Sequence, residues 1–244
     1  KISSNLKDAS AIVSTSHELP KYTKDNKIKT PKLFYLYHGT GTREYGFGSD
    51  LDYFDYIFAP GPYHKDRLIQ EKICDEKKIK LIGQPKFDWI EKHQKSKERL
   101  FNNNNPIFYY NPHWDMNLSS YLTWRNIILD FFRKHSDYNL VFAPHPLVKH
   151  LAKINKYTLE TKNDSADNII IDLDSSKLND GTYNKNADVY IGDVSSMVTE
   201  WINFSPRSCI FINSHKIRWD EKESYSMWKY GKVVDNPDSL DKVI

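Results

Sequence analysis

Short apolar runs alternate along the chain with longer stretches whose apolar residues recur at helical spacing. β-branched and aromatic residues dominate the short runs, as they do in buried strands. A strand followed by an amphipathic helix, repeated many times, is typical of βα units that build a mostly parallel sheet. The pattern therefore predicts an α/β fold. The expected strands cover residues 11–13, 33–37, 56–59, 80–82, 107–110, 140–143, 169–171, 189–191 and 209–212.

The clearest helix is expected between the strands at 107–110 and 140–143. Asn117 or Ser119 would cap it, because a side-chain oxygen at a helix start accepts a backbone N–H. Apolar residues at helical spacing indicate that this helix packs on the core and is not a base-stacking platform. These residues are Tyr121, Trp124, Ile128, Phe131 and Phe132. A further helix is expected after Gly61-Pro62, running towards Cys74.

A polar and charged stretch divides the chain. Residues 90–105 end in four consecutive asparagines, a composition that suits a linker or an exposed surface. We expect a first α/β domain over residues 1–95, a linker over 96–105 and a second α/β domain over 106–244. The first part holds fewer βα units than a complete nucleotide-type domain, and the chain begins with Lys1. We therefore expect the first domain to be incomplete at its N-terminus.

Composition narrows the class of protein. The chain of 244 residues is 39% apolar, enough for packed cores. A net charge of +3, from 35 basic and 32 acidic residues, gives no argument for nucleic acid as a partner. The two cysteines, Cys74 and Cys209, lie far apart in the sequence and fit a reducing cytosol. No apolar run approaches the length of a membrane span, and the start has no signal-peptide pattern.

Polar residues follow four of the expected strands. Ligands bind parallel sheets at the carboxyl ends of the strands, so these polar ends predict one lined cleft. The four segments are His38-Gly39-Thr40, Asn111-Pro112-His113, Pro144-His145-Pro146 and Asp193 to Glu200.

The segment from Asp193 to Glu200 looks like a strand, a polar turn and then a helix start. Ser195 and Ser196 would offer hydroxyls beside backbone N–H groups at the positive end of a helix dipole, which suits a phosphate. Asp and Ser are also ordinary helix caps without any ligand. Asp193 could instead cap the helix or orient a histidine. Glu200 lies one turn beyond Ser196, where it could accept hydrogen bonds from a ribose or form a capping pair with Ser196.

Two histidines are candidates for acid–base and phosphate chemistry. His38 precedes the flexible turn Gly39-Thr40 and could take a proton from a hydroxyl at neutral pH, unless its ring only satisfies loop carbonyls. His145 lies between two prolines that restrict the backbone and present the ring. Lys149 could add charge to the same anion or simply be solvated. Asp172, Asp188 and Asp193 form no tight cluster in the sequence, so we expect no metal. We also expect no cofactor.

The order of these motifs resembles the CDP-glycerol glycerophosphotransferase family, whose members build teichoic-acid and related capsular polymers. The resemblance rests on the segments at His38, His145 and 187–196 with Glu200, and covers about residues 33 to 240. Weaker matches are Gly83 to Asp88, Tyr110-Asn111-Pro112 and Trp228 to Gly231. Two positions depart from the family pattern. Val194 stands where the family usually has Tyr, and His113-Trp114 stands where the family commonly has a Thr together with an aromatic or basic residue.

The resemblance implies a glycosyltransferase B fold, in which two Rossmann-like domains face a cleft. It implies a CDP-glycerol or related CDP-polyol donor and a polymer or lipid-linked acceptor. His38, with Gly39 and Thr40, would act near the acceptor in the first domain. In the second, donor-binding domain, His145 would contact the diphosphate, Ser195 and Ser196 would hold phosphate oxygens, and Glu200 would bind the ribose. Pro112, Lys149 and Asp193 are further candidate substrate-binding residues. The protein would be cytoplasmic, with peripheral contact at the inner membrane leaflet.

Two alternatives remain open, and a third is disfavoured. A nucleotide-sugar glycosyltransferase of the same fold would use the same strand-end phosphate sites. A non-catalytic module that binds nucleotide diphosphates or polyol phosphates would keep the phosphate turn without needing a base. A nucleotide-sugar 2-epimerase is disfavoured, because the Gly-Gly turn and acidic motifs expected of it are absent from the sequence.

Overall fold

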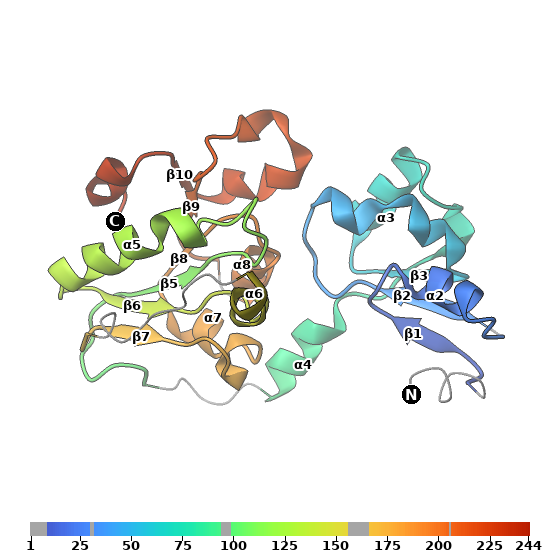
Figure 1. Ribbon diagram of the computed structural model, residues 1–244, viewed down its shortest axis with the longest axis horizontal. Helices are drawn as coiled ribbons and strands as arrows, with labels where there is room; N and C mark the ends of the chain where they lie inside the picture. The colour runs from blue at the N-terminus through green and yellow to red at the C-terminus, as the bar shows by residue number, and fades with distance from the viewer. Residues whose placement is uncertain (1–8, 30–31, 94–98, 156–165, 205) are drawn as a thin grey trace. The chain divides into compact units, whose positions relative to one another are not determined.

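The computed structural model describes residues 9–29, 32–93, 99–155, 166–204 and 206–244. The chain divides into two compact units, Lys1–Trp89 and Ile90–Ile244, and each has its own parallel sheet (Figure 1). The division falls shortly before the expected linker, part of which lies outside the described residues. The boundaries at 95 and 105 therefore stay predictions.

The first unit is built on a four-stranded parallel sheet in the order β1-β2-β3-β4. Aromatic and aliphatic side chains of these strands and of the following segments form its core, including Tyr35, Phe54 and Ile57. The strands are β1 (Ile12–Ser14), β2 (Leu33–Leu36), β3 (Tyr56–Ala59) and β4 (Ile79–Leu81). The helices are α2 (Leu19–Asp25), α3 (Pro62–Gln70) and α4 (Pro85–His93), which spans the division, with 3-10 turns η1 (Glu44–Phe47), η2 (Ser49–Tyr53) and η3 (Glu76–Lys78).

The second unit has a six-stranded parallel sheet in the order β10-β9-β8-β5-β6-β7. From β5 the chain first adds strands on one side and then returns to add β8, β9 and β10 on the other. The order therefore reverses between β5 and β8, as in a doubly wound Rossmann sheet. The strands are β5 (Ile107–Asn111), β6 (Asn139–Phe142), β7 (Ile169–Ile171), β8 (Val189–Gly192), β9 (Cys209–Ile212) and β10 (Lys232–Val234).

Helices and 3-10 segments of the second unit connect these strands and cover the sheet. They are α5 (Tyr121–Lys134), α6 (Leu147–Asn155), α7 (Thr182–Asn186), α8 (Met197–Phe204), η4 (Ser176–Leu178), η5 (Trp219–Glu221), η6 (Glu223–Tyr230) and η7 (Pro237–Lys242).

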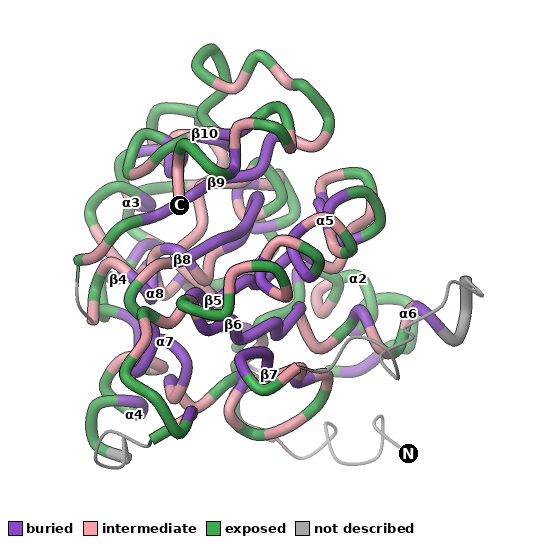
Figure 2. Tube along the Cα trace, turned by 90° about the vertical axis from the view of Figure 1, so that its left-hand side faces the viewer, coloured by how far each residue is buried: buried purple, intermediate pink, exposed green. Residues whose placement is uncertain are grey.

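Strand side chains alternate between two cores, one on each face of this sheet. Phe108 and Tyr110 pack with Trp124 of α5 on one face. Tyr109, between them in the sequence, packs with Tyr183 of α7 on the other face. Figure 2 shows the central strands buried along their length. Burial on both faces explains why these strands appear in the sequence as nearly continuous apolar runs.

The α/β class and every expected strand are confirmed, with bounds that are unchanged or shifted by one residue. The long helix begins at Tyr121, later than Asn117. Ser120 occupies the cap position without a side-chain cap, while the Ser119 hydroxyl accepts from the N–H of Tyr121 at 3.1 Å. Strand β10 was not expected. Its short apolar run carries little periodicity, and it forms because it pairs with β9.

Gly231, directly before β10, tests how tightly this last strand packs. A Cβ at Gly231 would overlap the backbone carbonyl oxygen of Cys209, whereas a Cβ at Gly61 would meet no heavy atom within 4 Å. Because a backbone atom cannot move aside cheaply, we expect Gly231→Ala to lower the free energy of unfolding by about 1–3 kcal/mol. Urea denaturation measures this. Gly61→Ala is the matched control, and equal effects of the two variants would contradict the close packing.

Candidate functional site

The carboxyl ends of β6, β5 and β8 lie side by side at the point where the strand order reverses. Asn111, at the end of β5, pairs in register with Gly192 at the end of β8. Its side-chain amide donates to the carbonyl of Ala143, just after β6, at 2.7 Å. The Pro112 carbonyl accepts from the N–H of His145 at 3.1 Å. The sheet therefore brings the predicted segments at Pro112, His145 and Asp193 to one edge, where Rossmann sheets bind ligands.

Asp193 connects the end of β8 to the loop before α5. Its side chain is fully buried. One carboxylate oxygen accepts from the N–H of His113 at 2.9 Å. The other accepts from the N–H and the hydroxyl of Ser120, at 2.7 and 2.9 Å. The Asp193 carbonyl accepts from the Trp228 indole at 3.1 Å. These contacts give Asp193 a positioning role, and direct contact with a ligand stays a prediction.

Burial raises the pKa of the Asp193 carboxyl to about 6, and the hydrogen bonds from Ser120, His113 and Val194 act in the opposite direction. Near neutral pH the carboxylate is therefore mostly ionised inside the protein, where its donors replace water. A buried charge held in this way fixes the loop that carries His113.

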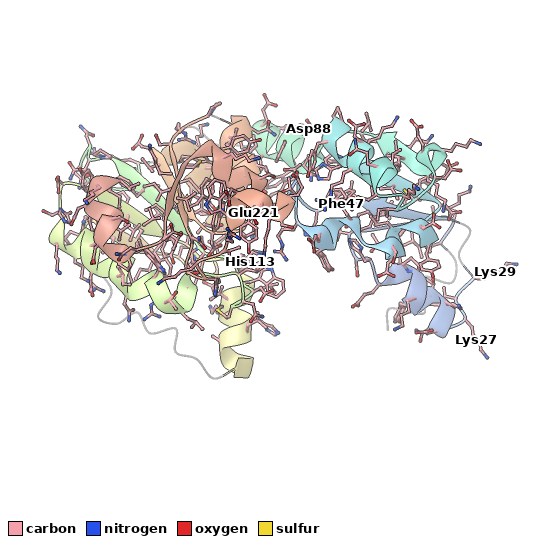
Figure 3. All side chains as sticks on the ribbon, turned by 90° about the horizontal axis from the view of Figure 1, so that it is seen from above. Lys27, Lys29, Phe47, Asp88, His113 and Glu221 are labelled. Atoms are coloured by element: carbon pink, nitrogen blue, oxygen red, sulfur yellow. The ribbon has the colours of Figure 1, made fainter. Side chains whose placement is uncertain are left out.

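His113, Trp114 and His145 form an aromatic cluster at this edge. The His113 and His145 rings lie 6.1 Å apart between centroids, and Trp114 lies 5.2 Å from His113 and 6.5 Å from His145. Figure 3 labels His113. His113 is not among the predicted site residues. Its place after β5 was the available signal, but a surface histidine–tryptophan pair was an equally good explanation of the sequence.

Both histidines accept a backbone N–H at Nδ1. His113 accepts from Asp115 at 3.0 Å, and His145 accepts from Leu147 at 3.2 Å. A neutral imidazole that accepts at one nitrogen carries its proton on the other. This assignment puts an N–H on Nε2 of each ring, the type of donor that binds a phosphate oxygen.

The two serines and Glu200 follow Asp193 in the chain. Ser195 is buried and its hydroxyl accepts from the N–H of Met197, at 3.2 Å, where α8 begins. It therefore caps the helix, and its side chain also forms a hydrogen bond that opposes the raised pKa of the buried Tyr190. Ser196 is only half-buried. Glu200 is buried in α8. Burial raises the pKa of Tyr109, and the charge of Glu200 adds to this shift. Ligand contacts of Ser195, Ser196 and Glu200 stay predictions.

Lys149 and Val194 have structural partners of their own. Lys149 forms an ion pair with Asp174, in the segment after β7, and its expected contact with a bound phosphate stays a prediction. Val194 is buried in the core with Val198 and Trp201. Its difference from the family pattern is therefore accommodated by packing in this chain.

In the first unit, His38 follows β2 and is exposed. Protein atoms around the ring nevertheless remove part of its water, and this desolvation is the main cause of a lowered pKa. A hydrogen bond with the backbone of Thr15 opposes the shift, while the charges of Arg43 and Lys86 add to it. His38 is therefore largely neutral at pH 7 and able to accept a proton.

Contacts from several elements hold the loop that begins at Gly39. The Tyr37 hydroxyl donates to the carbonyl of Gly46 at 2.7 Å. Arg67 of α3 stacks on Phe47 at 3.9 Å and donates to the carbonyl of Thr42 at 2.5 Å. The buried side chain of Gln84 donates to the carbonyl of Tyr37, next to His38, at 3.2 Å. The backbone around His38, Gly39 and Thr40 is therefore anchored on both sides.

Metal-binding clusters and membrane-spanning helices are both absent from the described parts of the chain. No group of three or more His, Cys, Asp and Glu residues there could hold a metal ion. No helix in those parts is both long and apolar enough to span a membrane.

Comparison with known proteins identifies the fold. No protein-family model and no curated protein matches the chain. Among solved structures, the UDP-GlcNAc 2-epimerase of Methanocaldococcus jannaschii with UDP-GlcNAc and UDP matches at TM-score 0.64 and 19% identity, covering 99% of this chain and 70% of that one. A variant of the wall teichoic acid polymerase TagF matches at TM-score 0.62 and 20% identity, covering 96% of this chain and 65% of that chain.

A further TagF variant, soaked with CDPG, matches at TM-score 0.60 and 20% identity, covering 96% of this chain and 64% of that chain. The chain thus spans about two thirds of the length of these structures. They establish a glycosyltransferase B fold. At these identities the fold alone is shared.

The buried carboxylate predicts a specific pH dependence. The pKa of the Asp193 carboxyl is 3.8 in the unfolded chain and about 6 in the folded protein. Below pH 3.8 the carboxyl is protonated in both states. Between pH 3.8 and about 6 it is protonated mainly in the folded state. Stability should therefore fall as the pH rises through this window, by up to about 3 kcal/mol. Asp193→Asn should remove this slope and, by mismatching the donors, cost about 1–3 kcal/mol at low pH.

Urea denaturation of wild type and variant from pH 4 to pH 7 measures the slope. Asp188→Asn is the control, because the exposed Asp188 also accepts a backbone N–H, from Ile107 at 2.8 Å. It should keep the wild-type slope. A slope that survives in Asp193→Asn would show that another group causes it.

Proposed function

We propose that the chain is part of a transferase that moves a polyol phosphate from a CDP-activated donor to an acceptor hydroxyl. Glycerol phosphate from CDP-glycerol is the preferred donor group. The acceptor would be a cell-wall or capsular polymer or its lipid-linked primer. The proposal is supported chiefly by the two histidines at the reversal of the strand order, His113 and His145, each with its proton assigned to Nε2. The wider enzyme, its acceptor and any contact with the inner membrane leaflet belong to the same proposal.

The edge of the second unit is suited to the diphosphate of the donor. Imidazole N–H groups of His113 and His145 would donate to phosphate oxygens, joined by the hydroxyls of Ser195 and Ser196. Donors fixed in advance stabilise charge that develops in phosphoryl transfer without needing to reorganise. Glu200 would accept from a ribose hydroxyl, and Lys149 would lie further from the reacting group.

His38 would act as the base in the first unit. The acceptor oxygen would form a bond to the β-phosphorus of CDP-glycerol, and the bond from that phosphorus to the bridging oxygen would break. CMP leaves with the electron pair of that bond, and His38 takes the proton of the acceptor hydroxyl. A neutral histidine at pH 7 suits this step, and the lowered pKa of His38 supports it.

A nucleotide-sugar enzyme is the second candidate, because a UDP-GlcNAc 2-epimerase shares the fold as closely as TagF does. Thermal stabilisation by different donors separates the two. A ligand at 100 times its Kd adds about 2.7 kcal/mol to stability. We expect CDP-glycerol to stabilise the protein more than CDP-ribitol or UDP-GlcNAc; stronger stabilisation by UDP-GlcNAc would favour the second candidate.

His145→Ala tests the diphosphate site in the same assay. Loss of a hydrogen bond to a charged group costs about 1.5–3 kcal/mol, so CDP-glycerol should bind at least about tenfold more weakly. Transfer of labelled glycerol phosphate should be lost while the unliganded melting temperature is kept. His150→Ala, on the exposed side of α6, is the control and should behave as wild type. Near-wild-type transfer by His145→Ala would refute the assignment.

His38→Ala tests the acceptor base. With CDP-glycerol saturating, turnover should fall by about 10²–10⁴-fold, while the Kd of CDP-glycerol should remain unchanged. If donor affinity fell and saturated turnover did not, His38 would bind the donor and would not be the base.

A further inference from the structure

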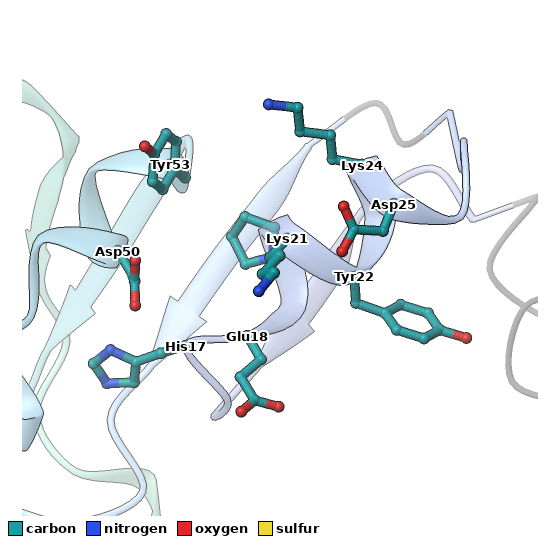
Figure 4. Close-up of a pocket in the computed structure, with 9 residues that line it drawn as sticks. His17, Glu18, Lys21, Tyr22, Lys24, Asp25, Asp50 and Tyr53 are labelled. Carbon is teal, nitrogen blue, oxygen red and sulfur yellow. The ribbon is translucent and has the colours of Figure 1, made fainter.

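The first unit contains a pocket of about 670 Å³ between the start of α2 and the turn η2 (Figure 4). His17, Glu18 and Lys21 line it from the α2 side, and Asp50 and Tyr53 line it from η2. Pockets of this size accommodate ligands as large as two or three sugar or polyol units. The motifs that suggested a function in the sequence include none of these residues.

Charged groups of both signs line this pocket. In the described part of the chain, the side chains of Glu18, Lys21 and Asp50 form no hydrogen bond and no ion pair. Lys24 and Asp25, at the same rim, also lack such partners there. Carboxylates accept hydrogen bonds from hydroxyl groups, and an ammonium binds a phosphate. The charged groups thus suit a ligand that carries both hydroxyls and phosphates, and the rings of Tyr22 and Tyr53 give the same pocket apolar surface.

The pocket lies at the same sheet edge as His38. His17 follows β1 and its Nε2 lies 2.8 Å from the Tyr35 hydroxyl of the neighbouring strand β2. His38 follows β2 and is hydrogen-bonded to the backbone of Thr15, two residues before His17. Burial lowers the pKa of His17, the charge of Asp50 opposes this shift and the charge of His38 adds to it. His17 therefore links the floor of the pocket to the proposed base.

We propose that this pocket binds the hydroxyl-rich, phosphodiester-bearing end of the acceptor chain. Asp50 and Glu18 would accept from its hydroxyls, Lys21 would pair with a phosphodiester, and the exposed Tyr53 ring would pack against its carbon backbone. Which hydroxyl reacts rests on the proposed function, but binding of such a chain to the pocket does not.

The test is calorimetric titration of the full chain with a synthetic tetramer of glycerol phosphate, in the absence of any donor. Wild type should bind it, and Asp50→Asn, Lys21→Ala and Tyr53→Ala should each raise its Kd by about tenfold or more. These side chains are exposed, so the variants should fold. Asp66→Asn and Lys29→Ala, exposed and outside the pocket, are the matched controls and should leave the Kd unchanged.

A second measurement separates this inference from the proposed function. The affinity for CDP-glycerol should be equal in wild type and in all three pocket variants. Binding of the tetramer that depends on Asp50 and Lys21 would support the pocket even if no donor turned over. No binding by wild type, or equal binding by the pocket variants and their controls, would overturn it.

Discussion

The buried carboxylate of Asp193 is the constraint on which the second unit depends. A buried ion is unfavourable unless polar groups of the protein replace its water. Here the backbone of His113 and Ser120 and the Ser120 hydroxyl supply them. These contacts determine where the turn after β5 lies, and with it the start of α5. Because β5 and β8 are adjacent, the Asp193 side chain connects the segments that follow both strands.

The histidines depend on this arrangement. The backbone N–H of His113 donates to the Asp193 carboxylate, and Nδ1 of the His113 ring accepts the backbone N–H of Asp115. In the same way, the backbone N–H of His145 donates to the Pro112 carbonyl, and Nδ1 of the His145 ring accepts the backbone N–H of Leu147. Both rings are thus fixed by main-chain groups. Groups fixed before a ligand arrives lose little entropy on binding it, and this favours phosphate recognition.

The sequence was sufficient to predict the strands and the α/β class, because buried parallel strands leave continuous apolar runs such as Leu140 to Ala143. It also indicated which strand ends carry polar residues. It did not reveal that Asp193 is enclosed, because an aspartate before a helix has the same sequence pattern whether it is a cap or a buried bridge. The roles of His113 and of the pocket at Asp50 were equally hidden, since they depend on contacts between residues distant in the chain. Lys149 illustrates the same difficulty: its partner, Asp174, lies 25 positions away.

The central claim is that the strand-end site holds a diphosphate whose outer phosphorus is transferred. The most direct measurement is ³¹P NMR of the protein with CDP-glycerol and an acceptor oligomer of glycerol phosphate. The account predicts loss of the diphosphate resonances together with the growth of CMP and of one new phosphodiester per CMP. Release of CDP, with no new phosphodiester, would contradict it.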